Sequence, residues 1–264
     1  MKCLVTGGSG FIGSNLILHL TNDLKYKVFN IDRLTYASND FFFKHIVNKS
    51  LYSFKRVDIC KTNKVLNVLK KFRPDIILHL AAESHVDRSI DKPNDFIQTN
   101  IIGTFSILEA SQKYFSDLTL NRKNIFKFIH VSTDEVFGSL KNLKSLPFNE
   151  KSPYSPNSPY SASKASSDHL VRSWNKTFNL PTVITNCSNN FGPYQSPEKL
   201  IPLVISKAIN GKQIPIFGQG KQVRDWLFVF DHVKALSKII TSSKSGTTYN
   251  IGGNNELRNI DLVK

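Results

Sequence analysis

The chain has 264 residues, of which 40% are hydrophobic and 21% are charged, and its formal net charge is +15. This composition is typical of globular proteins, and the length permits one large domain or two unequal ones, which excludes a small disulfide-stapled scaffold. The three cysteines, Cys3, Cys60 and Cys187, are far apart. Their spacing predicts neither a disulfide framework nor a metal site, and it favours a reducing compartment.

Hydropathy and charge bear on where the protein works and with whom. The sequence has no run of eighteen apolar residues and no signal-peptide pattern, so we expect a cytoplasmic protein without membrane contact. The 35 Lys and Arg residues against 20 Asp and Glu residues permit two interpretations, nucleic-acid binding or a compositional bias. Because the basic residues are scattered and form no run of five, we expect no nucleic-acid partner.

The first 135 residues alternate short apolar runs with longer amphipathic ones. The apolar runs predict strands over residues 2–6, 27–31, 75–79 and 126–131, and the amphipathic runs predict helices over 11–22, 61–72 and 94–114. Short apolar strands separated by helices indicate parallel pairing with both faces of the sheet covered. We therefore predict an α/β fold, a doubly wound parallel sheet of the Rossmann type, whose ligand lies beyond the carboxyl ends of the strands.

The second half of the chain has a weaker pattern. The polar segment 139–158 leads to a predicted helix over 160–177 and a strand over 182–185, and a strand at 214–217, a helix at 231–240 and a strand at 249–251 follow. We expect two domains, a dinucleotide-binding domain over residues 1–188 that carries the catalytic residues and a smaller substrate-binding lobe over residues 189–264. Residues 257–264 begin an amphipathic helix that the chain does not complete, so we expect this lobe to be partial.

A glycine-rich turn, Thr-Gly-Gly-Ser-Gly-Phe-Ile-Gly over residues 6–13, lies between the first predicted strand and the first predicted helix. Gly7, Gly10 and Gly13 suit a tight turn, a close approach to a diphosphate and close packing of helix on strand. Asp32 follows the second strand, where a carboxylate accepts from the ribose hydroxyls of NAD and repels a 2′-phosphate. Arg33 beside it leaves NADP open, although the pattern favours NAD.

A second motif, Tyr-x-x-x-Lys, pairs Tyr160 with Lys164 at the start of a predicted helix. Four residues are about one helical turn, so we expect the phenol and the ammonium group on one face, with the cation lowering the pKa of the tyrosine. Such a pair also occurs by chance on solvated helices. Together with the glycine turn, it predicts that Tyr160 takes the proton of an alcohol during oxidation and that Lys164 holds the cofactor.

A third cluster, Thr133, Asp134 and Glu135, follows the strand predicted at 126–131. A capped turn with two solvated acids is one interpretation. The other places all three at the ligand edge of the sheet, near the helix of Tyr160. Because oxidation of an alcohol needs only the Tyr-Lys pair, two adjacent carboxyl groups predict a second proton transfer, with one group as acid and the other as base.

Longer strings make a family resemblance specific. They cover residues 79–89, 130–138, 158–168, 186–194, 197–202 and 224–227. With the glycine turn and the Tyr-Lys pair, the chain resembles the extended short-chain dehydrogenase/reductases and, among them, the dTDP-glucose 4,6-dehydratases, over essentially its whole length. Sugar-nucleotide 4-epimerases of the same fold have no Thr-Asp-Glu at this place, which separates the two groups.

The resemblance implies a lyase that uses NAD as a recycled cofactor. Thr133 and Tyr160 would bracket the 4-hydroxyl group of the sugar, Glu135 would remove the C5 proton, and Asp134 would protonate the departing C6 hydroxyl group. Hydride would leave C4 for NAD and return to C6, giving dTDP-4-dehydro-6-deoxy-glucose. UDP-glucose stays open as a substrate, and so does a catalytically impaired NAD-binding remnant, because the family continues past Lys264.

The resemblance also implies binding residues. The cofactor positions are Gly7, Gly10, Phe11, Ile12, Gly13, Asp32, Arg33, Leu34, Thr35, Asp58, Ile59, Leu80, Ala81, Ala82, Glu83, Ser84, Thr99, Tyr160, Lys164 and Asn190. The substrate positions are Ser84, Thr133, Asn189, Lys199, Leu200, Pro215, Ile216, Phe217, Arg224 and Asn259. No metal is implied. Family members pair through the helices equivalent to 94–114 and 160–177 and commonly serve dTDP-rhamnose and polysaccharide synthesis, so a homodimer with that role is expected.

Overall fold

A seven-stranded parallel sheet forms the centre of the computed structural model, which describes residues 1–140, 145–216 and 219–264. The strand order is β3-β2-β1-β4-β5-β6-β9, and every neighbouring pair is parallel. The strands are β1 (Lys2–Thr6), β2 (Lys27–Asp32), β3 (Tyr52–Arg56), β4 (Ile76–His79), β5 (Lys127–Thr133), β6 (Thr182–Cys187) and β9 (Thr248–Ile251). The order reverses between β1 and β4, which places the crevice for a ligand there.

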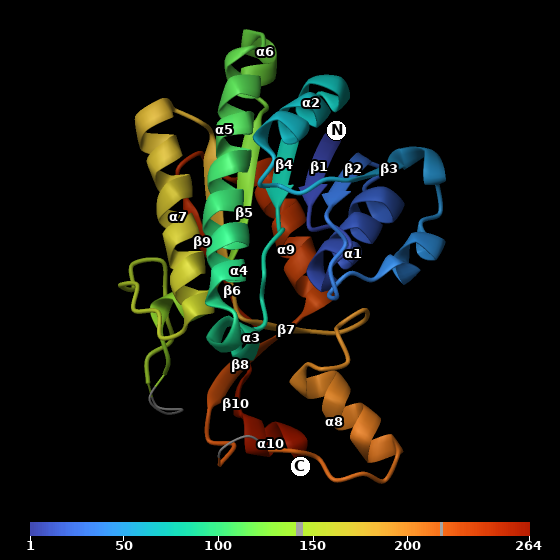
Figure 1. Cartoon of the computed structure of the whole chain (residues 1–264), viewed down its shortest axis with the longest axis vertical. Coiled ribbons are helices and arrows are strands. Elements are labelled where there is room, and N and C mark those ends of the chain that lie inside the picture. Colours follow the sequence, from blue (N-terminus) through green and yellow to red (C-terminus); the bar gives the residue numbers. More distant parts are fainter. Residues whose placement is uncertain (141–144, 217–218) are drawn as a thin grey trace.

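Helices cover both faces of this sheet (Figure 1). Successive strand residues point to opposite faces, so Leu4 packs beneath α2 (Thr62–Phe72), α5 (Gly103–Ser116) and α7 (Pro159–Phe178). Its neighbours Cys3 and Val5 pack on the other face, against α1 (Phe11–Leu18) and α9 (Val229–Ser242). Because both faces are buried, the strands read as continuous apolar runs, which confirms the α/β, doubly wound prediction.

Shorter helical segments join these elements. The α helices among them are α3 (Val86–Asp91), α4 (Pro93–Phe96) and α6 (Leu120–Lys123), and the remaining turns are His19–Asp23, Asp40–His45, Lys49–Leu51, Ile97–Ile102 and Asp134–Phe137. The single helix predicted over 94–114 is thus α4, a wider π turn and α5 in succession. No helix in the described ranges has the length and apolarity to cross a bilayer.

A smaller layer lies beyond the carboxyl ends of the main strands (Figure 1). Its three-stranded sheet has the order β10-β8-β7 and consists of β7 (Asn189–Phe191), β8 (Val223–Phe228) and β10 (Glu256–Arg258), accompanied by α8 (Leu200–Ile209) and α10 (Asn259–Val263). Between β8 and β10 the chain returns to the main body, where α9 packs on α1 and β9 pairs with β6. A domain boundary at residue 188 therefore assigns α9 and β9 to the small lobe, although both pack on the main sheet.

The strand predicted over 214–217 is wrong. Residues 214–216 form no strand, and Phe217 lies outside the described residues. Pro215 has no N–H to give to a sheet, and Ile216 is 37% exposed, so the apolar residues here do not mark a buried strand. The next strand of this lobe along the chain is β8, whose apolar run is interrupted by Arg224 and Asp225.

Candidate functional site

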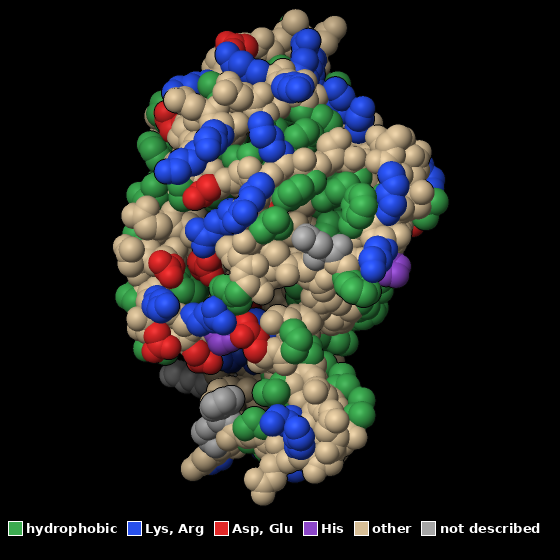
Figure 2. Space-filling model, turned by 45° about the vertical axis from the view of Figure 1, so that its right-hand side comes forward, with side chains coloured by type: hydrophobic (Ala, Val, Ile, Leu, Met, Phe, Trp, Pro, Cys, Tyr) green, Lys and Arg blue, Asp and Glu red, His purple; other side chains and the backbone are tan. Residues whose placement is uncertain are grey.

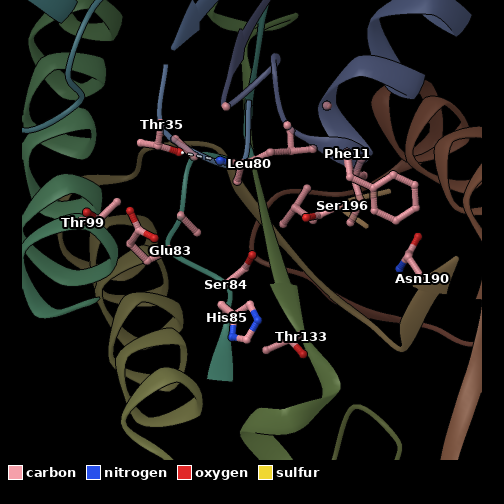
Figure 3. A pocket seen from close by; sticks show the side chains of 18 of the residues that line it. Phe11, Thr35, Leu80, Glu83, Ser84, His85, Thr99, Thr133, Asn190 and Ser196 are labelled. Carbon is pink, nitrogen blue, oxygen red and sulfur yellow. Dashed lines mark hydrogen bonds between the residues drawn. The ribbon is translucent and has the colours of Figure 1, made fainter. Parts of the chain in front are cut away.

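A cavity of about 310 Å³ lies at the carboxyl ends of β1, β2, β4, β5 and β6. The labelled side chains in Figure 3 surround it, with Glu83 and Thr99 on one side and Phe11 and Asn190 on the other. Figure 2 shows acidic, basic and histidine side chains at the narrow waist between the main body and the small lobe. The position is the one that the strand order predicts for a ligand of a doubly wound sheet.

The glycine turn forms one wall of this cavity. Gly7 has a φ of +69°, and a Cβ atom there would lie 2.6 Å from the backbone nitrogen of Ala81. A Cβ atom on Gly13 would lie 2.3 Å from the carbonyl oxygen of Gly7. No side chain caps α1, which begins at Phe11, so its first N–H groups remain for an anion at the cavity.

Charged side chains, among them Asp32, Arg33 and Glu83, line another part of the cavity. Asp32 is 8% exposed, and its carboxylate accepts from the backbone N–H groups of Ser9 at 3.1 Å and Leu34 at 2.8 Å. The guanidinium group of Arg33 forms an ion pair with Glu83. These residues line the cavity where the sequence predicts the ribose of adenosine.

Tyr160 and Lys164 enter the cavity from the first turns of α7. Ser158 caps this helix through the backbone N–H of Ser161, and Pro159 occupies its first position, so the start of the helix is fixed. The ammonium group of Lys164 is buried and donates to the carbonyl oxygen of Val131 at 2.9 Å.

The expected lowering of the pKa of Tyr160 by Lys164 is wrong for this structure. Burial raises the pKa of the phenol well above its ordinary value, the charge of Glu135 adds to this, and a hydrogen bond with Thr133 opposes it only in part. Burial also lowers the pKa of Lys164. The phenol therefore keeps its proton until positive charge is brought next to it.

The two acids follow directly on β5. Thr133 ends the strand, and its hydroxyl oxygen accepts from the backbone N–H of Glu135 at 3.2 Å, which starts the short turn Asp134–Phe137. Burial, together with the charge of Glu135, raises the pKa of Asp134 to about 7 despite the opposing charge of Arg224. Burial also raises the pKa of Glu135, against the charges of Arg224 and Lys199. Both acids are only partly exposed and line the cavity at the ligand edge. The turn is capped by Thr133, as the alternative predicts, but its two acids are not freely solvated.

A second cavity of about 400 Å³ adjoins the first on the other side of these acids. It shares Asp134, Glu135, Ser188 and Asn189 with the first cavity and adds Arg224 from β8. Lys199, just before α8, lines the first cavity and donates to the carbonyl oxygen of Ser84 at 3.4 Å. Two cations from the small lobe thus face the two acids of the main sheet.

The predicted residues divide into two groups. The cavities bring together Gly7, Gly10, Phe11, Ile12, Gly13, Asp32, Arg33, Thr35, Ile59, Leu80, Ala81, Ala82, Glu83, Ser84, Thr99, Thr133, Asp134, Glu135, Tyr160, Lys164, Asn189, Asn190, Lys199 and Arg224. Leu34, Asp58, Leu200, Pro215, Ile216 and Asn259 do not line either cavity, and Phe217 lies outside the described residues. Asp58 accepts from the backbone N–H of Cys60 at 2.9 Å, as a turn-capping residue does.

Sequence reasoning missed several lining residues, among them Tyr36, His85, Ser188, Ser196 and Glu198. Ser188 follows β6 directly, so the rule that ligands bind at strand ends could have found it. Tyr36, Ser196 and Glu198 lie in loops whose folding has no periodic signal. In the described ranges no group of His, Cys, Asp and Glu side chains is arranged to hold a metal ion.

Two buried hydroxyl groups indicate that the cavity suits a polar ligand. The side-chain oxygens of Thr99 and Ser188 line it and have no hydrogen-bond partner within the described part of the chain. Buried polar atoms are nearly always hydrogen-bonded, so a ligand that reaches both would remove this cost. With the uncapped start of α1 for a diphosphate and Asp32 for a ribose, the residues fit a dinucleotide.

Comparison with known proteins gives a consistent result. A model of the family described as GDP-mannose 4,6 dehydratase matches residues 4–264. The dTDP-glucose 4,6-dehydratase of Salmonella typhimurium is 53% identical over 270 residues, which cover 100% of this chain and 75% of that protein. The enzyme of that name from Neisseria meningitidis is 53% identical over 263 residues, with coverage of 100% and 74%.

Solved structures are similar over the whole chain. The dTDP-glucose 4,6-dehydratase of Bacillus anthracis in complex with NAD is 43% identical, with a TM-score of 0.87 and coverage of 100% of this chain and 78% of that one. The dTDP-glucose 4,6-dehydratase of Streptomyces venezuelae, also solved with NAD bound, is 38% identical, with a TM-score of 0.91 and coverage of 100% and 79%. A UDP-glucose 4-epimerase of Thermotoga maritima is 28% identical, with a TM-score of 0.87 and coverage of 100% and 80%.

Proposed function

This chain belongs to the dTDP-glucose 4,6-dehydratase family, and we propose that it dehydrates dTDP-glucose to dTDP-4-dehydro-6-deoxy-glucose with NAD as a recycled cofactor. Identity to the dehydratases is 38–54%, against 28% for the epimerase of similar fold. One observation carries the proposal. Two adjacent carboxyl groups with raised pKa values, Asp134 and Glu135, line the same cavity as the Tyr160 phenol.

NAD fits the cavity through this chain's own groups. The start of α1 would hold the diphosphate, Asp32 a ribose, and Lys164 with Thr99 the nicotinamide half. When bound, NAD would supply a reversible acceptor for the hydride of C4 and a cationic ring that favours an ionised phenol.

Tyr160 and Thr133 act on the sugar 4-hydroxyl group in this proposal. Their hydrogen bond sets both oxygens next to one another, so one hydroxyl group of a substrate can contact both. The phenol receives the proton of the 4-hydroxyl group as C4 becomes a ketone. That ketone makes the proton on C5 acidic, which allows a carboxylate to remove it.

Elimination of water is assigned to the two acids. Glu135 removes the C5 proton, and Asp134 in its protonated form donates to the C6 hydroxyl group, which leaves as water. The pKa of about 7 lets Asp134 hold a proton at neutral pH, as a general acid must. A proton returned to C5 completes the reaction, so the net change is the loss of one water.

The cations of the small lobe suit the nucleotide diphosphate. Arg224 presents a planar fork of donors, and Lys199 adds a point charge on the other side of the acids. We place the sugar between these cations and Tyr160, with Asn189 and Ser84 contributing hydrogen bonds. In this placement the main body binds the cofactor and the small lobe binds the nucleotide of the substrate.

We also propose a homodimer that works in the cytoplasm, with its product leading to dTDP-rhamnose and polysaccharide. Ile97, Ile102, Phe105 and Phe178 are each at least 40% exposed on the segments around α5 and α7, which gives an apolar surface for a second copy. The three cysteines are unpaired, which suits a reducing compartment.

Incubation of the purified chain with dTDP-glucose tests the function. The 4-keto product is followed by the absorbance that it develops in alkali, with UDP-glucose in parallel and Tyr160→Phe as the inactive control. Product from dTDP-glucose alone supports the proposal. Faster product from UDP-glucose would change the substrate, and retained NAD binding without any product would make the chain an NAD-binding remnant.

A further inference from the structure

Two adjacent residues at the end of β2 have opposite consequences for the choice of cofactor. Asp32 repels the 2′-phosphate of NADP, whereas an arginine beside it is the residue type that binds this phosphate. The side chain of Arg33 is 37% exposed and reaches the cavity, so it is long and free enough to approach a ribose phosphate. Selectivity for NAD therefore depends on what Arg33 contacts when no 2′-phosphate is present.

The carboxylate of Glu83 forms an ion pair with the guanidinium group of Arg33. The two side chains, fifty residues apart in the sequence, form this ion pair at the wall of the cavity, and Glu83 is only 8% exposed. The hydroxyl group of Tyr36 donates to the second carboxylate oxygen of Glu83 at 3.3 Å. Both carboxylate oxygens of Glu83 thus contact residues of the loop that follows β2, one Arg33 and the other Tyr36.

The backbone of Glu83 is fixed as well. Its N–H donates to the side-chain oxygen of Asn100 at 2.8 Å, and its carbonyl oxygen accepts from the amide nitrogen of Asn100 at 3.0 Å. The same amide nitrogen of Asn100, which is buried, also donates to Ser163 on α7 at 2.9 Å. The backbone of Glu83 is therefore fixed through Asn100 to α7, and its side chain in turn fixes the guanidinium group of Arg33.

The remaining charges nearby do not replace this pairing. Arg88 stacks on the ring of Tyr36 at 3.5 Å from its centroid, and Arg56 donates to the backbone carbonyl of Arg33 at 3.0 Å. Neither forms an ion pair with Glu83 among the described residues. Within the described ranges, the one cationic partner of the Glu83 carboxylate is Arg33.

We propose that Glu83 determines cofactor specificity by holding Arg33 in an ion pair, so that this arginine cannot bind the 2′-phosphate of NADP. The proposal rests on the proposed function only in taking NAD as the cofactor. A 2′-phosphate would have to displace a nearly buried carboxylate that is fixed through Asn100 and Tyr36 before it could reach the guanidinium group. Asp32 then adds its own repulsion, so two carboxylates act against NADP.

Equilibrium binding of NAD and NADP to the full chain tests this proposal, with competition between the two cofactors as the measurement. The variants are Glu83→Gln, Arg33→Ala and the double variant, and Asp117→Asn is the matched control, because it removes the carboxylate of an exposed ion pair with Lys70 that does not line the cavity. The quantity compared is the ratio of the two dissociation constants. It is independent of turnover, so failure here differs from failure to dehydrate dTDP-glucose.

Glu83→Gln should shift the ratio about tenfold toward NADP, because a freed arginine gains a charge-assisted contact with the phosphate. Arg33→Ala and the double variant should both stay close to the unchanged protein, since neither has a released guanidinium group. An unchanged ratio in Glu83→Gln would overturn the proposal, and so would an equal shift in the double variant. Glu83→Ala provides the same comparison if Glu83→Gln is not recovered folded.

Discussion

The ammonium group of Lys164 donates a hydrogen bond of 2.9 Å to the backbone carbonyl of Val131, two residues before the catalytic-edge residue Thr133. A lysine of α7 is thereby tied to β5, and Tyr160, one turn earlier, is placed next to Thr133 and the two acids. The pKa of the phenol is nevertheless raised, because burial and the charge of Glu135 outweigh the opposing hydrogen bond with Thr133. We propose that Lys164 positions Tyr160 and contacts the cofactor.

Replacement of this lysine should abolish most of the activity. Lys164→Met keeps the length of the side chain but loses both the bond to Val131 and the charge, so we expect turnover to fall at least about 100-fold. Lys176→Met, near the exposed end of the same helix, is the control and should keep full turnover. Initial rates on dTDP-glucose measure both. Comparable activity of the two variants would remove Lys164 from the mechanism.

A buried carboxylate beneath the site should control stability. Asp168 is 1% exposed and contacts His130 at 3.2 Å, Asn186 at 3.1 Å and the hydroxyl group of Tyr154 at 2.9 Å. Burial raises its pKa, but the hydrogen bond and charge of His130 and the charge of Lys164 bring it below the ordinary value on balance. Asp168 therefore stabilises the fold at any pH above the pKa that this side chain has in the unfolded chain. This stabilisation is lost as the pH falls through the lower pKa that Asp168 has in the folded protein.

Asp168→Asn should lower the free energy of unfolding by about 3 kcal/mol at pH 7, because it removes the carboxylate that accepts from Tyr154 and Asn186 and that offsets the buried charge of Lys164. The difference from the unchanged protein should shrink in acid. The control is Asp117→Asn, which breaks an exposed pair with Lys70 and should change stability by less than about 0.5 kcal/mol. Denaturant unfolding at pH 7 and at pH 4 measures both, and equal losses at the two sites would contradict the assignment.

The acid role of Asp134 predicts a pH dependence. Burial and the charge of Glu135 raise the pKa of Asp134 to about 7, so its protonated form prevails below pH 7 and is lost above it. We expect kcat/KM to fall as the pH rises through this range and Asp134→Asn to remove that limb, with turnover lower by about 100-fold. Profiles from pH 5.5 to 9 measure this, and an unchanged alkaline limb in the variant would assign the titration to another group.

The raised pKa of Asp134 also makes the stability of the fold depend on pH. A carboxyl group whose folded pKa exceeds its unfolded value stabilises the fold at low pH and stops doing so as the pH passes about 7. Asp134→Asn should therefore raise the thermal unfolding midpoint more at pH 8.5 than at pH 5. Thermal melts of both proteins at the two values decide this, and a larger gain at pH 5 would contradict the direction of the shift.

The main sheet could be predicted because its signals are local. Strands such as β1 and β4 are continuous apolar runs, and the glycine turn and the Tyr-Lys pair each fall within eight residues. Contacts such as Arg33 with Glu83 could not be predicted, since they join residues fifty positions apart through the folding of two loops. The pKa of Tyr160 was misjudged for the same reason, because burial and Glu135 arise only in three dimensions.

The small lobe was predicted less well because its elements violate the usual patterns. α8 begins Leu-Ile-Pro, and a proline in the first turn of a helix is tolerated although it resembles a loop signal. β8 places Arg224 and Asp225 within a strand, where Asp225 accepts from the backbone N–H groups of Gly253 and Asn255. These charged side chains serve contacts between segments, so their spacing has no strand period.

Gly7 and Gly211 have similar positive φ angles but different surroundings. Replacing each by alanine therefore distinguishes the cost of a left-handed backbone from the cost of a steric clash. Gly7 has a φ of +69° and Gly211 a φ of +61°, but a Cβ atom would meet Ala81 at 2.6 Å in the first case and nothing within 4 Å in the second. Gly211→Ala should thus cost only about 1 kcal/mol of unfolding free energy, the price of a left-handed backbone. Gly7→Ala should cost clearly more and also weaken NAD binding, because the turn next to the start of α1 must move. Unfolding and NAD titrations on both variants measure this, and equal costs with unchanged binding would show that the turn accommodates a side chain.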